Sequence, residues 1–163
     1  MPQRQLRIEI DHQRLICLQD GRTVALYPVS TARLGPGERM DSGCTPRGLH
    51  RVRLKIGEGC PENTVFVGRR PSGEIYREAL GEAEPDRDWI LTRILWLSGL
   101  QSGFNRGGQC DTLRRYIYIH GTPEESLIGL PVSHGCIRMR NRDLLKLFDW
   151  AENGMPVEIV EEA

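Results

Sequence analysis

The stretch "PVSHGCIRM", residues 131–139, decides how the rest of this chain of 163 residues is interpreted. It places an imidazole, a glycine and a thiol in succession at His134, Gly135 and Cys136, and a guanidinium follows at Arg138. A structural free cysteine behaves as a small buried hydrophobe, whereas the neighbours here are polar or lack a side chain. Gly135 lets the chain turn sharply and lets a substrate carbonyl approach the backbone amides. The pattern therefore indicates a nucleophilic cysteine.

A nucleophilic cysteine needs a neighbour that helps it to ionise, because a free thiol has a pKa of about 8.5 and is mostly protonated at neutral pH. Two imidazoles are candidates: His134, which shares a face with Cys136 in extended backbone, and His120, at the end of "RRYIYIHG" (residues 114–121). That stretch alternates isoleucines with polar or aromatic residues, which predicts a strand with His120 on one face. We expect the amides of residues 134–136 to converge on an oxyanion.

Much of the chain alternates polar and apolar residues, as β-strands do. The runs with this pattern are "LRIEI" (6–10), "RLICL" (14–18), "TVALYPVS" (23–30), "GLHRVRLKIG" (48–57), "TVFVG" (64–68) and "VEIV" (157–160). The second and third runs should form a hairpin across the Asp20-Gly21 turn. In the fourth run, the even-numbered residues from His50 to Ile56 should share one face.

One helix is expected in "RNRDLLKLFDWAENGMP" (residues 140–156). Asn141 is a suitable N-cap, Asp143 lies in the first turn, and apolar residues follow at helical spacing. Asn153-Gly154 before a proline should end the helix.

The segment 77–113 lacks a sustained period and predicts a flap or insertion over the active site. Within it, "WILTRILWLSGL" (residues 89–100) favours a strand over a helix. The expected fold class is mostly β with one C-terminal helix, in a single domain of residues 1–163.

Composition excludes several functions. Lys plus Arg and Asp plus Glu number 22 each, so the net charge is zero, which argues against nonspecific binding to nucleic acid or anionic membranes. The chain shows no secretory signal and no apolar stretch long enough to span a bilayer, so we expect a cytoplasmic protein without membrane insertion. Five cysteines without a CxxC pair do not resemble a disulfide framework or a zinc ribbon. Cys44, Cys60 and Cys110 lie in loops and are expected to be incidental, redox-sensitive or in contact with the flap.

Several motifs together resemble one family. "IHGT" (119–122), "SHGCIRM" (133–139) and "NRD" (141–143) are similar to the signature of the L,D-transpeptidase, or YkuD-domain, family. Upstream, "RLICLQDGRTVALYPVST" (14–31) resembles the opening hairpin of that family, and "TPRG" (45–48) resembles its "TPxG" turn. The resemblance covers nearly the whole chain.

The resemblance implies a compact β-sandwich-like fold and an enzyme that acts on peptidoglycan stem peptides or soluble muropeptides. The cysteine attacks the bond between the third residue and D-alanine of a tetrapeptide stem, and a thioester forms. Family members also react with carbapenems, and they need no metal or organic cofactor. The roles implied by position are Cys136 as nucleophile, His120 as base, His134 and Gly135 as pocket and oxyanion hole, Ser133 and Thr122 as polar supports, and Arg138 as an orienting cation for substrate.

Two outcomes follow the thioester, and the motif does not choose between them. An amine gives L,D-transpeptidation, as expected if the protein is exported to the periplasm or cell envelope. Water gives an L,D-carboxypeptidase that trims recycled muropeptide tetrapeptides in the cytosol, the compartment expected from the sequence.

Two other classes of function remain as alternatives. One is a zinc enzyme that uses His120, His134 and Cys136 as metal ligands. The other is a peptidoglycan-binding module without catalysis.

Overall fold

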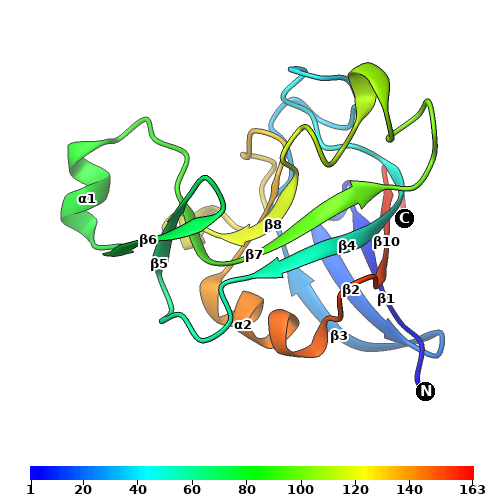
Figure 1. The fold of residues 1–163 in the computed structure, drawn as a ribbon, viewed down its shortest axis with the longest axis horizontal. Helices are drawn as coiled ribbons and strands as arrows, with labels where there is room; N and C mark the ends of the chain where they lie inside the picture. Colours follow the sequence, from blue (N-terminus) through cyan, green and yellow to red (C-terminus); the bar gives the residue numbers. More distant parts are fainter.

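The computed structural model describes all 163 residues, and ten strands form a single sheet (Figure 1). The strands are β1 (Arg4–Glu9), β2 (Arg14–Gln19), β3 (Arg22–Pro28), β4 (Gly48–Ile56), β5 (Thr64–Val67), β6 (Arg70–Ile75), β7 (Ile90–Gly99), β8 (Tyr118–Gly121), β9 (Ile137–Met139) and β10 (Pro156–Val160). The helices are α1 (Glu78–Ala83) and α2 (Asn141–Trp150), and two short 3₁₀ turns are Gly108–Cys110 and Glu125–Leu127.

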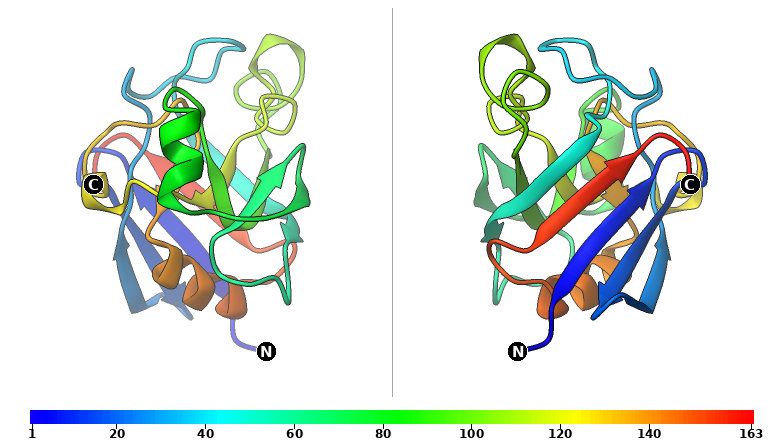
Figure 2. Two further views of the ribbon diagram at one scale, coloured as in Figure 1. Left: turned by 90° about the vertical axis from the view of Figure 1, so that its left-hand side faces the viewer. Right: turned by 90° about the vertical axis from the view of Figure 1, so that its right-hand side faces the viewer.

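The strand order places the last strand in the middle of the sheet. Along the main path the order is β3-β2-β1-β10-β4-β7-β5-β6, and β8 pairs with β7 and then with β9. The pairs β1–β10 and β8–β9 are parallel, and all other pairs are antiparallel. The N-terminal and C-terminal strands therefore run side by side, as the right-hand view of Figure 2 shows.

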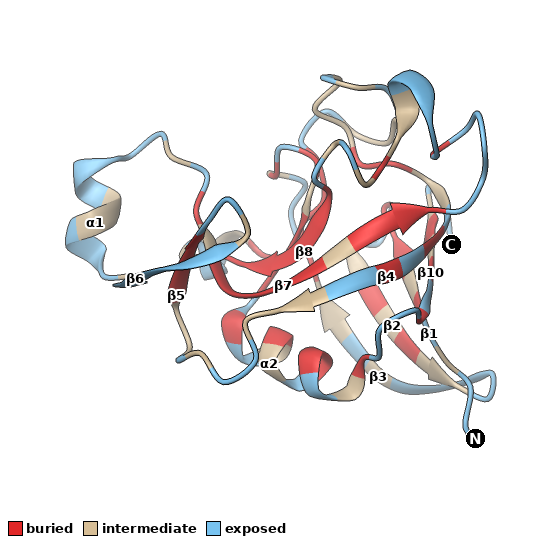
Figure 3. Ribbon diagram, in the orientation of Figure 1, coloured by how far each residue is buried: buried red, intermediate tan, exposed pale blue.

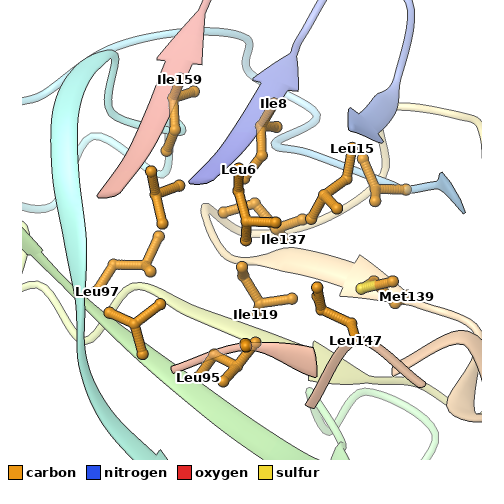
Figure 4. Packing of buried hydrophobic residues seen from close by; sticks show 14 of the residues in the cluster. Leu6, Ile8, Leu15, Leu95, Leu97, Ile119, Ile137, Met139, Leu147 and Ile159 are labelled. Atoms are coloured by element: carbon orange, nitrogen blue, oxygen red, sulfur yellow. The ribbon is translucent and has the colours of Figure 1, made fainter. Parts of the chain in front are cut away.

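The main core lies between the two halves of this curled sheet, and α2 closes one side of it. Twenty buried residues form the cluster, including Leu6, Ile8 and Leu15 on one wall and Ile119 and Ile137 on the other (Figure 4). Four side chains of α2 are buried, and they come at helical spacing, as the sequence predicts. The fold is thus mostly β and sandwich-like, and its C-terminal helix is confirmed.

The range 77–113, expected to be a flap or insertion, is divided by a core strand. The predicted strand within it is confirmed as β7, which joins β4, β5 and β8 and is almost entirely buried (Figure 3). Residues 77–89, which carry α1, and residues 100–113 lie outside the sheet. The short α1 buries none of its residues, so its sequence has no apolar periodicity from which a helix could be predicted.

Three local expectations were wrong, each for a physical reason. The strand at 114–121 begins only at Tyr118, because the chain turns before it and Tyr116 adopts a left-handed φ of 57°. Leu54 is exposed rather than inward, because a β-bulge between Val52 and Leu54 breaks the alternation. Asn141 does not cap α2, whose N-cap is Arg140.

The side chain of Asn141 joins the helix to its neighbours instead. Its amide donates to the carbonyl of Thr122 at 2.9 Å, and its oxygen accepts from the hydroxyl of Thr92 at 2.5 Å. Neither α1 nor α2 has the length or the apolar run that a transmembrane span requires.

Candidate active site

The parallel pairing of β8 with β9 places the reactive residues on one face of the sheet. Ile119 is in register with Ile137, and His120 with Arg138. Because side chains alternate along a strand, the two isoleucines enter the core and His120, Arg138 and Cys136 face the other side. The sequence-based assignment of faces in this strand is therefore confirmed.

The sulfur of Cys136 lies in a cleft of about 390 Å³ lined also by Asp88, Arg115, Tyr116 and His134. The amide of Tyr118 donates to Sγ at 3.3 Å, and the thiol lies 3.3 Å from the carbonyl of Tyr116, to which it donates. Burial raises the pKa of the thiol to about 12; Asp88 adds to this rise, and the Tyr118 amide and two arginines offset only part of it. The resting thiol is therefore protonated, not ionised as the sequence suggested.

His120 is fully buried behind the cleft. Its Nδ1 lies 2.7 Å from the carbonyl of Gly121, which fixes the proton on Nδ1 because a carbonyl can only accept. Nε2 is then free of a proton, and it has no hydrogen-bond partner. Burial lowers the pKa of His120 more than the charge of Asp88 raises it. A neutral imidazole with an unused lone pair thus faces the same side as Cys136, although no hydrogen bond joins the two.

The turn before Cys136 depends on Gly135, whose φ is 131°. A Cβ there would lie 3.2 Å from the carbonyl oxygen of Cys44. Thr45 donates its hydroxyl to the carbonyl of Gly135 at 2.9 Å, which ties the "TPRG" turn to the cysteine loop. Only glycine fits both the φ angle and this close approach.

Ser133 supports the same turn from inside. Its hydroxyl donates to the carbonyl of Cys136 at 2.6 Å and accepts from the amide of Gly135 at 3.2 Å. Of the three amides expected to form an oxyanion hole, that of Gly135 is therefore engaged. The amides of His134 and Cys136 donate no hydrogen bond within the protein.

Thr122 does not reach the cleft. It is buried, its hydroxyl accepts from the amide of Glu124 at 3.1 Å, and its carbonyl accepts from Asn141. Its contacts are those of a support for the turn after β8.

Arg138 is not a free cation for substrate, because it is 5% exposed and paired with Asp88. The two atoms Nη2 and Oδ1 are 2.9 Å apart, and the other oxygen of Asp88 lies 3.3 Å from Nδ1 of His134. Burial raises the pKa of Asp88, but the charges of His120, Arg138 and His134 outweigh it and lower the pKa overall. Asp88 is thus a member of the site that the sequence did not reveal, since "PDRDW" (85–89) has no distinguishing pattern.

The arginine that lines the cleft is Arg115, in the turn before β8. It donates to the carbonyl of Cys44 at 2.6 Å and to that of Gly37 at 3.2 Å. These bonds hold the guanidinium at the cleft, where its charge lowers the pKa of Cys136. The sequence missed Arg115 because the turn was expected to be strand.

The zinc alternative requires three ligands that converge, and no group of three His, Cys, Asp or Glu side chains does so. All five cysteines are free thiols. Cys17 is buried in the core, where burial raises its pKa to about 12, as expected of a structural cysteine. His50 is likewise structural, with Nε2 2.9 Å from the hydroxyl of Thr112.

Several L,D-transpeptidases are similar to this chain in sequence. The putative L,D-transpeptidase YqjB of Bacillus subtilis is 28% identical over 148 residues, which cover 91% of this chain and 66% of that protein. The putative L,D-transpeptidase YkuD of Bacillus licheniformis is 50% identical over 46 residues, 28% of each chain. The probable L,D-transpeptidase YbiS of Escherichia coli is 46% identical over 48 residues, 29% of this chain and 16% of that protein.

Solved structures share the fold. L,D-transpeptidase 3 of Mycobacterium tuberculosis, in complex with a faropenem-derived adduct, matches with a TM-score of 0.60 at 19% identity over 98% of this chain and 61% of that one. An L,D-transpeptidase from Mycobacterium smegmatis matches with a TM-score of 0.58 at 18% identity over 98% and 59%. This chain thus spans about three fifths of those structures, and the short matches to YkuD and YbiS cover less of those proteins.

The family model described as the L,D-transpeptidase catalytic domain, YkuD, matches residues 3–159. That range includes every strand from β1 to β9, α2 and most of β10. With Cys136 in an open cleft and His120 behind it, the match to nearly the whole chain shows that the protein belongs to the YkuD family of L,D-transpeptidase catalytic domains.

Proposed function

We propose that the protein cleaves the bond between the third residue and D-alanine of a peptidoglycan tetrapeptide stem and transfers the acyl group to an amine. The observation that carries this proposal is the position of Cys136 Sγ in the cleft, on the same sheet face as the unpartnered Nε2 of His120. The likeness to L,D-transpeptidases supports the substrate class.

In the first step Sγ attacks the carbonyl carbon of the bond, and its proton passes to Nε2 of His120. The carbonyl of Gly121 stabilises the imidazolium that forms, because it already accepts the Nδ1 proton at 2.7 Å. Proton transfer during the attack suits a thiol with a pKa of about 12, which is not ionised beforehand.

The negative charge that develops on the carbonyl oxygen needs donors. The amides of His134 and Cys136 have no other partner and are the proposed pair. When the intermediate collapses, the C–N bond breaks, His120 returns its proton to the amine of D-alanine, and a thioester remains on Cys136.

The second step uses the same groups, Sγ of Cys136 and Nε2 of His120, with their roles reversed. An acceptor amine attacks the thioester, its nitrogen loses a proton to His120, and the sulfur leaves as a thiol. Water in place of the amine gives net loss of D-alanine. The compartment determines which nucleophile is present. In the cytoplasm, water would attack the thioester formed from a recycled muropeptide, and in the periplasm the amine of a neighbouring stem would attack it.

Incubation of the purified protein with a disaccharide-tetrapeptide, with and without an amine acceptor, tests the proposal by mass spectrometry. We expect a cross-linked or amine-linked product that requires Cys136, and none from Cys136→Ala. Cys110→Ala is the matched control, because that thiol lies in a 3₁₀ turn outside the cleft. Tripeptide as the sole product would show that water, and not an amine, resolves the thioester. Turnover by Cys136→Ala would refute the mechanism.

A further inference from the structure

A second concave site lies outside the cleft. Its lining residues come from β4, from the C-terminal end of β7 and from the loop at 100–113, and Figure 1 shows this loop following the end of β7. The volume of the site is about 190 Å³. The residues that line it are Arg51, Arg53, Ser98, Gly99, Arg106, Asp111 and Leu113. Three arginines thus line one small cavity in a protein whose net charge is zero.

Two features of the fold bring these arginines together, the pairing of β4 with β7 and the position of the loop at 100–113. Arg51 is in register with Ser98 across the β4–β7 pair, and Arg53, two residues further along β4, is exposed like Arg51. The third arginine, Arg106, comes from the loop.

The loop is held against the end of the sheet by Asn105. This residue is fully buried, its amide donates to the carbonyls of Arg47 at 3.0 Å and Leu49 at 3.1 Å, and its oxygen accepts from the amide of Gln101 at 2.9 Å. Arg106, the next residue, is therefore carried on a fixed part of the loop.

None of the three guanidinium groups is satisfied within the protein. They donate no hydrogen bond to another residue, and the ion pairs of the chain involve other arginines. The one carboxylate at the cavity, Asp111, accepts from the amides of Gly107 at 2.6 Å and Arg114 at 2.9 Å, so it closes the loop. The cavity therefore has an excess of about two positive charges, counting three arginines against one carboxylate.

A second, independent observation points to a ligand. The hydroxyl of Ser98 is buried, the residue is 9% exposed, and Oγ has no hydrogen-bond partner. A buried polar group normally has a partner, because leaving it without one is costly. Ser98 is one of the residues that line the cavity of the arginines, so this unpartnered hydroxyl lies at its wall.

We propose that Arg51, Arg53, Arg106 and Ser98 form a binding site for a phosphate group, separate from the cysteine cleft. Guanidinium groups match phosphate oxygens in geometry and charge, and a serine hydroxyl supplies a further donor. An excess of two positive charges favours a dianionic terminal phosphate or a diphosphate over a singly charged phosphodiester or carboxylate.

The proposed phosphate site and the cysteine cleft are lined by neighbouring residues of one segment, 113–116. Leu113 lines the cavity and accepts the indole N–H of Trp96 at 3.1 Å, while Arg115 and Tyr116 line the cleft. A molecule that carries a terminal phosphate could therefore be held beside the cysteine cleft. Binding itself does not depend on the proposed acyl transfer.

Calorimetric titration of the full chain at low ionic strength, with pyrophosphate, inorganic phosphate, dimethyl phosphate and acetate as probes, tests the site. We expect saturable binding of the first two, much weaker binding of the last two, and weakening by added salt. R51Q/R53Q should weaken pyrophosphate binding by about tenfold or more, because hydrogen bonds to charged groups are lost. S98A should weaken it less, with no loss of thermal stability.

The matched control is R22Q/R77Q, which removes two exposed arginines that are unpaired and remote from the cavity. It should bind pyrophosphate like the natural protein, and acylation of Cys136 by imipenem should be unchanged in all variants that keep their thermal melting curve. Absence of binding, equal loss in the control, equal affinity for acetate, or full affinity in S98A would each overturn the proposal.

Discussion

Cys136 holds its proton in the resting protein, since burial raises its pKa to about 12, and His120 is neutral because burial lowers its pKa. Two neutral partners must then exchange a proton during the attack on a carbonyl. A free thiolate would instead react faster at higher pH, in proportion to its ionised fraction. The two mechanisms therefore differ in their pH dependence.

The rate constant for acylation of Cys136 by imipenem should change little between about pH 7 and pH 9, where both groups keep their resting protonation. It should fall only on the acid side, below the ordinary histidine range, as His120 takes up a proton. Stopped-flow fluorescence across this range measures it. A tenfold rise per pH unit over the same interval would show that a thiolate formed in advance is the reacting species.

Asp88 is expected to act through other residues, because it balances the buried charge of Arg138 and raises the pKa of His120. Asp88→Asn should move the acid limb of the acylation profile to lower pH. The cost in unfolding free energy should be about 1–2 kcal/mol, less than for a fully buried pair because the Asp88 side chain is 36% exposed. Asp86→Asn, in the same loop but without an ion pair, is the control; an unmoved acid limb in Asp88→Asn would contradict this role.

At the scale of elements, β8 shows what alternation predicts and where it fails. The alternation of Ile117 and Ile119 identified the buried face correctly. It did not identify the turn at Tyr116, where the neighbouring Arg115 contacts a segment distant in sequence that no local pattern reveals. The same reason explains Asn141, whose side chain was expected to cap its own helix but bonds to Thr122.

Gly99 tests how the loop at 100–113 is held on β7. A Cβ at this position would collide with the backbone carbonyl and the side-chain oxygen of Asn105, a fully buried residue held by hydrogen bonds. Gly99→Ala should therefore lower the unfolding free energy by about 1–3 kcal/mol, as overpacking does.

Gly81→Ala in α1 is the comparison for Gly99→Ala. Its Cβ would meet the hydroxyl and two ring carbons of Tyr76, a side chain, and no backbone atom. A smaller loss than in Gly99→Ala is expected, since a side chain gives way more readily than backbone and alanine favours helix over glycine by about 1 kcal/mol. Urea denaturation of both variants gives the difference, and equal losses would contradict this account.

At the scale of the whole molecule, local motifs predicted the class of fold, which the structure confirms, and they singled out the cysteine that lies in the cleft, because short stretches of sequence determine both. The motif also named His120 and the turn residues Ser133 and Gly135, whose contacts the structure supplies. It did not find Asp88 or Arg115, because they enter the cleft from segments distant in sequence and outside any motif.

The core between the two sheet halves should carry most of the stability. Ile119→Ala removes a fully buried side chain of the main cluster. Ile119 precedes His120 in β8 and points into the core from the opposite face of that strand. A loss of about 2–5 kcal/mol in unfolding free energy is expected, together with slower acylation, because β8 also positions the imidazole. Leu130→Ala, at a side chain that is 53% exposed, should cost little in the same urea titration; similar losses in both would show that this core is not the main source of stability.

The position of β10 between β1 and β4 has a consequence for biosynthesis. A nascent chain emerging from the ribosome can form the β1–β2–β3 meander early, but nothing bridges that meander to β4 until residues 156–160 have been translated. Until then the apolar faces of both halves stay uncovered, and they are a target for chaperones. The cysteine cleft should therefore be completed only after β10 has been translated, although the residues that line the cleft are made earlier.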